Sequence, residues 1–283
     1  MTIQKNIELT KLHPFEGHPY KVKDDAEMEA LTESVYQHGI LTPLIVRPLE
    51  GTVDEYEIVS GHRRFRAAQV AGIQEIPAFV YPLDRDAAII MLVDSNLHRE
   101  HILPSEKAFA YKMKMEALSR QGFRSDLTSD QVGRKLETAE IIGQQTDDSK
   151  SQVRRYIRLT NLNSHILTMV DEGRIAFTPA VEISYLSEWE QCKLVDEMNY
   201  ADATPNLSQA QRLRKLSQQG RLTSDAMYAV MSEEKANQKE RLKIPMERIR
   251  KYFPKSYTSA QMEEDIVKMC EARFRKRADR DSR

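Results

Sequence analysis

The first hundred residues alternate between two hydrophobic patterns. Short runs of β-branched and aromatic residues bounded by turn formers are typical of strands, and they occur at 43–48, 55–61 and 76–82. Apolar residues at helical spacing predict helices over 26–39, 62–72 and 84–99. In the second of these helices we expect Phe65 and Ala68 to face the core, together with Gln69 or Val70. The alternation predicts an N-terminal domain in which helices pack on a small mixed sheet.

From about Leu103 onward the strand pattern disappears, and the chain is predicted to be helical to about residue 232. Residues 123–137 are expected to form a loop with a short helix inside it. Further on, Thr258 and Gln261 have the spacing of a capping box that opens a last helix. That helix is predicted to carry one apolar face, made of Met262, Ile266, Met269, Cys270 and Phe274.

The segment 138–162 has the pattern of a helix-turn-helix. A first helix is predicted from about Thr138 to Thr146, where Gly143 permits close approach of the second. Asp147 and Asp148 suit the turn, since Asp tolerates left-handed backbone angles. Ser149 is a good N-cap for a second helix, which is expected to bury Val153, Ile157 and Thr160.

The outer face of this second helix is polar and basic, and the stretch 149–160 contains four basic residues and no acidic one. Gln and Arg side chains suit base edges in the major groove of DNA, and Lys and Arg neutralise phosphates. An ordinary solvated helix pair is the plain alternative. We therefore predict DNA contacts from Ser149, Lys150, Ser151, Gln152, Arg154, Arg155 and Arg158.

A second basic motif, SGHRRFRAA at 60–68, follows directly on a predicted strand. Gly61 permits a tight turn, the amides that open a helix attract anions, and Arg63, Arg64 and Arg66 suit phosphate oxygens. A triphosphate site is therefore expected, although the same turn could equally hold a neighbouring carboxylate or the DNA backbone. It is not a P-loop, because the chain has no GxxxxGK[ST] motif. Farther along, Asn96 could ligate a metal ion or a phosphate, and Arg99 could add positive charge.

Composition narrows the class of protein. The net charge is −1, but residues 235–255 carry eight basic and two acidic side chains, so the charge is unevenly distributed. No run approaches the ~18 apolar residues that a membrane span needs, and the start lacks a secretory signal, so we expect no membrane partner. Cys192 and Cys270 lack metal-binding spacing and fit a reduced, cytoplasmic protein.

In order along the chain, these motifs resemble the ParB/RepB family of partition proteins over about residues 1–232. The segments that carry the resemblance are GILTPLIVR at 39–47, GHRRFRAA at 61–68, NLHRE at 96–100 and RYIRLTNL at 155–162. Each motif is modest alone, and the ordered set is quite specific. The resemblance implies a CTP-binding N-terminal domain and a central domain that binds a palindromic DNA site. It also implies a homodimeric clamp on DNA and a ParA-type ATPase as partner.

Carried over position by position, the resemblance assigns the nucleotide, with Mg, to Thr42, Gly61, His62, Arg63, Arg64, Arg66, Asn96 and Arg99, and the metal to Asn96. Two positions depart from the family. His62 and Ser95 stand where the family often has Glu, and those acids are implicated in handling the metal and in hydrolysis. CTP hydrolysis is therefore expected to be weak or absent, while binding is retained.

The predicted fold class is α+β in three parts. A ParB-like mixed-sheet domain is expected at 1–102, an all-α helix-turn-helix domain at 103–232, and a basic linker with a helical, potentially dimerising segment at 233–283. The function predicted is DNA partition of a plasmid, mobile element or chromosome, close to the nucleoid or plasmid. Two alternatives stay open: a transcription regulator or nucleoid-associated protein, and a nucleotide-using, kinase-like enzyme on the same N-terminal fold.

Overall fold

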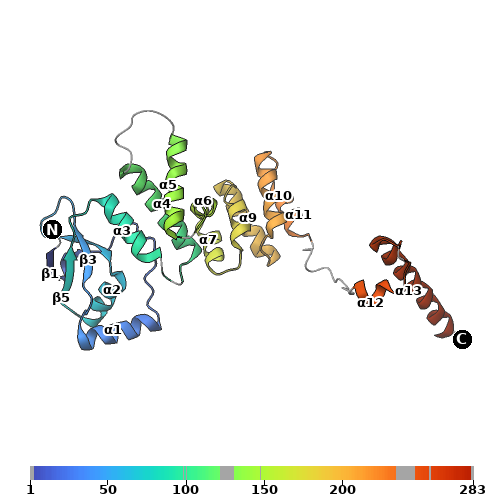
Figure 1. Ribbon diagram of the computed structural model, residues 1–283, viewed down its shortest axis with the longest axis horizontal. Helices are drawn as coiled ribbons and strands as arrows, with labels where there is room; N and C mark the ends of the chain where they lie inside the picture. The colour runs from blue at the N-terminus through green and yellow to red at the C-terminus, as the bar shows by residue number, and fades with distance from the viewer. Residues whose placement is uncertain are drawn as a thin grey trace. The chain divides into compact units, whose positions relative to one another are not determined.

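A computed structural model of the chain describes residues 3–97, 99, 101–121, 131–146, 148–233, 246–254 and 256–281. The chain divides into two compact units, 1–233 and 234–283. Within the described ranges, no helix has the length and apolar character that crossing a bilayer requires. The α+β class predicted from the sequence is confirmed, with one mixed sheet near the N-terminus and helices in the rest (Figure 1).

The sheet has five strands in the order β1-β5-β3-β4-β2. The strands are β1 (Ile3–Glu8), β2 (Leu12–His13), β3 (Leu44–Pro48), β4 (Tyr56–Ser60) and β5 (Glu75–Val80). β5 runs antiparallel to β1 and parallel to β3, while β4 runs antiparallel to β3 and parallel to β2. The three strands predicted from hydrophobic runs are confirmed. The edge strands β1 and β2 were not predicted.

Helices cover both faces of this sheet. On one face α1 (Ala26–His38) and α2 (His62–Ala71) pack against Leu44, Ile58 and Ile76. On the other face α3 (Arg85–Leu97) packs against Val59. Because both faces are covered, consecutive residues of β4 are buried instead of alternate ones.

The helices begin and end close to where the sequence predicts. Asp25 caps α1 by accepting a hydrogen bond from the Met28 amide at 2.9 Å, and Asp84 accepts one from the Ala87 amide at 2.7 Å ahead of α3. The inner face of α2 is partly different from the prediction. Phe65, Ala67 and Ala68 are buried, but Gln69 and Val70 are exposed, because the buried face of α2 is rotated toward Ala67 relative to the predicted one.

Helices make up the rest of the first unit. They are α4 (Pro104–Gln121), α5 (Gln131–Thr146), α6 (Lys150–Leu159), α7 (Ser164–Asp171), α8 (Phe177–Ile183), α9 (Glu188–Ala201), α10 (Leu207–Gln218) and α11 (Ser224–Met231). The predicted first helix of the helix-turn-helix begins earlier than expected, at Gln131 instead of Thr138. Part of the loop predicted at 123–137 is therefore helical, and residues 122–130 lie outside the described ranges. Leu159, Ile166, Ile183 and Leu194 are fully buried in a shared core.

The second unit contains α12 (Met246–Arg250) and α13 (Ser259–Asp281). The predicted capping box is confirmed, because the Thr258 amide donates to Gln261 Oε1 at 2.9 Å and the Gln261 amide donates to Thr258 Oγ1 at 3.4 Å. Of the predicted apolar face, Met262 is buried, whereas Met269 and Phe274 are exposed. Ile266 is partly buried and Cys270 is exposed, and Arg250, ahead of α13, contacts Met262 Sδ at 3.6 Å.

Candidate functional site

The turn between β4 and α2 positions the predicted phosphate-binding arginines. Gly61 has φ of 109°, a backbone conformation that side chains disfavour. A Cβ at this position would lie 2.8 Å from Leu44 Cγ and 3.1 Å from Arg64 Nη2. Glycine therefore allows the strand to end against β3 while α2 begins at once with its amides free.

Hydrogen bonds from Arg64 link this turn to the segment before β3. Its Nη1 donates to the carbonyl oxygen of Thr42 and, at 2.9 Å, to that of Pro43. Burial lowers the pKa of the half-buried Arg64 guanidinium from its ordinary value. The structure thus brings Thr42, Gly61 and Arg64 together, as the sequence predicted, with Arg64 bound to backbone carbonyls.

Arg63 and Arg66 lie on the side of α2 that faces α1, and both are paired with carboxylates. Arg63 contacts Glu27 Oε2 at 3.0 Å and Asp25 Oδ1 at 3.4 Å. Arg66 forms two hydrogen bonds to Asp24, at 2.8 and 3.1 Å, which lower the pKa of that carboxyl group. These two arginines therefore bind neighbouring carboxylates, which is one of the alternatives that the sequence left open for this turn.

Arg63 also lines a cavity of about 720 Å³, within the size range of small-molecule sites. Arg99 lines the same cavity, so two of the predicted nucleotide ligands are found there. Five further charged groups line the cavity: Lys21, Lys23, Asp25, Glu27 and Glu106. The lining therefore has four cationic side chains and three carboxylates, and Asp25 and Glu27 are the groups that pair with Arg63. A polyphosphate could take the place of these carboxylates on the cationic side chains.

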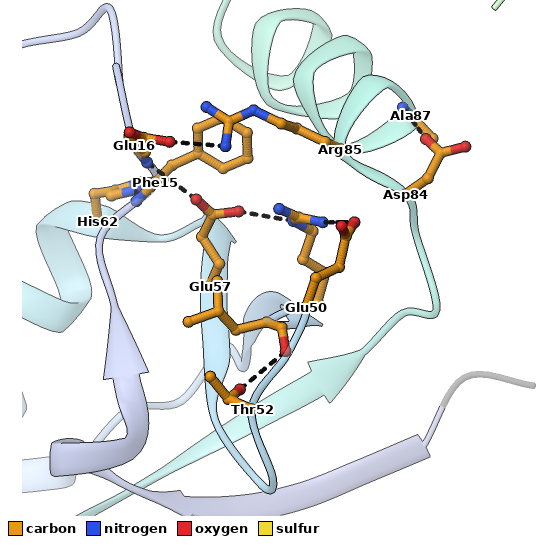
Figure 2. Close-up of polar contacts among 11 residues, drawn as sticks. Phe15, Glu16, Glu50, Thr52, Glu57, His62, Asp84, Arg85 and Ala87 are labelled. Carbon is orange, nitrogen blue, oxygen red and sulfur yellow. Dashed lines mark hydrogen bonds and ion pairs between the residues drawn. The ribbon is translucent and has the colours of Figure 1, made fainter.

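His62 lies at the start of α2 and is held neutral. The Phe15 amide donates to its Nε2 at 3.3 Å, so the proton is on Nδ1 (Figure 2). The His62 ring also packs on that of His18, with centroids 3.8 Å apart. Burial, with smaller effects from His18 and Arg99, lowers the pKa of His62 to about 3. A neutral donor therefore stands where the family often has an acid.

This pKa makes folding stability depend on pH. In the unfolded chain His62 takes up a proton near pH 6.5, whereas in the folded chain it stays neutral down to about pH 3. The unfolded state therefore binds more protons in that window, and stability falls as the pH falls. Between pH 7 and pH 5 we expect His62 to account for a loss of roughly 1–2 kcal/mol.

Urea unfolding of the wild-type chain and of His62→Gln at both pH values measures this loss. The glutamine oxygen can still accept a hydrogen bond and does not titrate, so the variant should show a smaller decrease. An equal decrease in the two proteins would contradict the assignment.

Asn96 does not project into the 720 Å³ cavity as a lining residue. It is buried in α3, where its Nδ2 donates to the Leu92 carbonyl at 2.7 Å and to Ser95 Oγ at 3.2 Å. Among the residues that the structure describes, no three His, Cys, Asp or Glu side chains gather as a metal site would need. His98, between Asn96 and Arg99, lies outside the described residues.

A buried ion pair joins the neighbouring strands β3 and β4. Glu57 on β4 accepts from Arg47 Nε at 2.7 Å and from the Glu16 amide at 3.0 Å, and Glu16 in turn pairs with Arg85 at 2.8 Å (Figure 2). Both Arg47 and Glu57 are only 3% exposed. The pair fixes the segment whose Phe15 amide holds His62, and the sequence analysis missed it.

The predicted helix-turn-helix forms as α5 and α6. Ser149 caps α6 by accepting from the Gln152 amide at 3.2 Å, and Val153 is fully buried beside Ile142 of α5. Gly143 lies so close to the turn that a Cβ would be 2.4 Å from the Asp148 carbonyl oxygen. Asp147 lies outside the described residues, and Ile157 and Thr160 are partly buried.

The seven predicted DNA contacts lie along α6 and its cap. Ser149, Ser151 and Arg154 are exposed, and Gln152 is partly so. Lys150 pairs with Glu140 at 3.0 Å. The remaining two are oriented by α8 and its end: Arg155 donates to Thr178 Oγ1 at 2.8 Å and Arg158 to the Ser184 carbonyl at 3.0 Å. Within the described part of the chain, none of the three arginines pairs with a carboxylate.

Comparison with known proteins agrees with this architecture. Residues 1–97 match the family described as the ParB N-terminal domain. Stage 0 sporulation protein J of Bacillus subtilis is 34% identical over 172 residues, which are 61% of this chain and 54% of that protein. Chromosome-partitioning protein Spo0J of Thermus thermophilus is 36% identical over 170 residues, 60% of this chain and 55% of that protein.

The chain thus spans about half the length of these curated relatives. Among solved structures, ParB of Caulobacter crescentus complexed to the centromeric parS site is 25% identical, with a TM-score of 0.44, and the match covers 75% of this chain and 98% of that one. Residues 1–97 thus match the ParB N-terminal domain, and the chain is similar to ParB-type partition proteins over about 60% of its length.

Proposed function

We propose that this chain is a sequence-specific DNA-binding partition protein. The observation that carries the proposal is the outer face of α6, where Arg154, Arg155 and Arg158 have no carboxylate partner within the described residues. Guanidinium groups left without acids on a helix-turn-helix are suited to phosphates and to guanine edges. The names of the relatives, chromosome-partitioning and sporulation proteins, support the same role.

Arg155→Ala is expected to weaken binding to a selected duplex by roughly 1–3 kcal/mol, about 5- to 150-fold. Thr178 and the Phe177 ring, 5.0 Å from the guanidinium carbon, hold this arginine in place, so little ordering is needed on binding. Anisotropy titration against a duplex selected from a random pool measures the change. Arg174→Ala, which removes an exposed arginine after α7, is the control. Equal affinities of wild type and Arg155→Ala would exclude this contact.

We further propose that the cavity beside α2 binds CTP, with Mg carried by the nucleotide's phosphates. The donor set supports a triphosphate, because Arg63, Arg99, Lys21 and Lys23 line a cavity of about 720 Å³. The phosphates would replace Asp25 and Glu27 as the partners of Arg63. His62, which is not among the residues lining this cavity, is a neutral imidazole in place of an acid and does not supply a base to activate water. The family's carried-over residues Thr42, Gly61, Arg64, Arg66 and Asn96 then shape or flank this site.

Arg63→Gln is expected to weaken CTP binding about 10- to 100-fold, the loss of a hydrogen bond to a charged group. Calorimetry with CTP and magnesium measures it. Arg120→Gln is a matched control, because Arg120 also pairs with a carboxylate, Asp86 at 2.7 Å, but lies outside this cavity. CTP binding that is unchanged in Arg63→Gln would refute the site, and binding that is absent in the wild-type chain would refute the nucleotide.

In this proposal the first unit contains the nucleotide domain to about residue 102 and the DNA-binding helices to about residue 232. The exposed apolar residues of α13 then meet a second copy of the chain, giving a dimer that closes on palindromic DNA in response to CTP. The partner is a ParA-type ATPase, the place of action is plasmid or nucleoid DNA in the cytoplasm, and hydrolysis is weak because His62 and Ser95 lack the acidic function.

A further inference from the structure

Tyr185 lies between two arginines at the junction of α6, α8 and α10. The guanidinium carbon of Arg158 is 4.0 Å from the centre of its ring, and that of Arg214 on α10 is 3.6 Å from it. Tyr185 directly follows the end of α8 and is 41% exposed, so the stack reaches the surface. Two like charges are thus held close together by one aromatic ring.

The charge around this stack is not balanced. Arg158 and Arg214 meet on the Tyr185 ring, and the one carboxylate paired with either of them in the described residues is Glu182, 2.9 Å from Arg214. Arg158 Nε is buried and has no hydrogen-bond partner. An anion at this junction would relieve the repulsion between these two guanidinium groups.

The stack is also rigid, which matters for binding. Arg158 is fixed by the Ser184 carbonyl at 3.0 Å and by the Tyr185 ring, and Arg214 is fixed by Glu182 and by the same ring. A guanidinium that is already ordered loses little conformational entropy when it binds a phosphate, and its planar donors match phosphate oxygens.

We propose that Tyr185 and Arg214 form a second phosphate-binding site for duplex DNA, continuous with α6 through Arg158. This inference rests on the proposed DNA binding and extends it from the helix-turn-helix to α10. Arg158 then contacts the backbone, while the more exposed Ser151 and Arg154 are left to face base edges. The partner is DNA, because the site shares Arg158 with the face that α6 would present to the groove.

Helix α10 offers a matched test, since it carries two arginine–glutamate pairs two positions apart. Arg214 pairs with Glu182 beside Tyr185, whereas Arg212 pairs with Glu233. Two positions on a helix are about 200° apart, so the two pairs point to opposite sides. The variants are therefore R214Q and E182Q at the proposed site, with R212Q and E233Q as controls.

The full chain is titrated with its selected duplex and with a random duplex at several salt concentrations. In R214Q the slope of log affinity against log salt should become shallower by about 0.9, with affinity for both duplexes reduced several-fold. In E182Q every arginine remains and one acid is lost, so affinity should rise by a similar factor. This gain cannot come from weakened folding, which keeps the test decisive even where R214Q is less stable.

If R214Q behaves like R212Q, or E182Q like E233Q, while the wild-type chain binds DNA, the Tyr185 junction is only a structural stack and this inference fails alone. If the wild-type chain binds neither duplex, the proposed function fails and the inference fails with it.

Discussion

Replacing Glu57 with Ala is expected to lower the free energy of unfolding by about 3–5 kcal/mol, the cost of leaving a buried charge without its partner. Arg47 is 3% exposed and its Nε lies 2.7 Å from Glu57, so the variant leaves this buried guanidinium with the exposed Glu50 as its remaining carboxylate contact in the described residues. The Glu16 amide also loses its acceptor. Urea unfolding of wild type and variant measures the difference.

Glu50 provides the control, because it is a second carboxylate in contact with Arg47. Glu50 lies 3.3 Å from Arg47 Nη1 but is largely exposed, and Glu50→Ala should cost no more than about 1 kcal/mol. Replacing both buried partners together, as Arg47→Met with Glu57→Leu, should recover most of the lost stability, since no unpaired charge remains. A Glu57→Ala variant as stable as Glu50→Ala would show that the pair does not act as a buried one.

This pair illustrates what the hydrophobic pattern could not reveal. The predicted strand at 55–61 was correct, but alternation assigns Glu57 to a polar face, and it is buried because α3 covers that side of the sheet. Glu57 can be buried inside the strand because Arg47, 10 positions earlier in the chain, neutralises its charge. Pairing across strands depends on register, and one sequence does not give the register.

The arginine loop shows the same limit. Gly61 and the three arginines could be found from residue types and spacing, because turn chemistry and helix starts are local. Their partners could not, since Asp24, Asp25 and Glu27 lie 36 to 42 positions away and approach only when α1 packs on α2. Lys21 and Lys23 reach the cavity for the same reason and carry no motif of their own.

The helix-turn-helix was predicted more completely because its signals are local. Ser149 as a cap and Gly143 at the close approach both hold in the structure. The orientation of Arg155 and Arg158 was not foreseen, since it depends on Thr178 and Ser184 from α8 and its end. Sequence thus identified the face of α6, and tertiary contacts decide which of its side chains are already fixed.

Gly61→Ala is expected to have the second large effect, on both stability and nucleotide binding. Its φ of 109° already costs a side-chain-bearing residue about 1–2 kcal/mol. The added methyl would also lie 2.8 Å from Leu44 Cγ, and Leu44 is fully buried, so the core must shift. We expect a total loss of about 2–5 kcal/mol in the free energy of unfolding.

Gly72→Ala separates the two causes. Gly72 ends α2 with φ of 71°, and a Cβ there would meet nothing within 4 Å, so this variant carries the backbone strain without the collision. It should cost about 1–2 kcal/mol and leave CTP binding unchanged. Gly61→Ala should unfold at lower urea than Gly72→Ala and bind CTP more weakly, because the new methyl displaces Arg64, 3.1 Å away, from the carbonyls of Thr42 and Pro43. Equal stability of the two variants would mean that the turn relaxes around the methyl group, and that Arg64 does not need glycine beside it to keep its place.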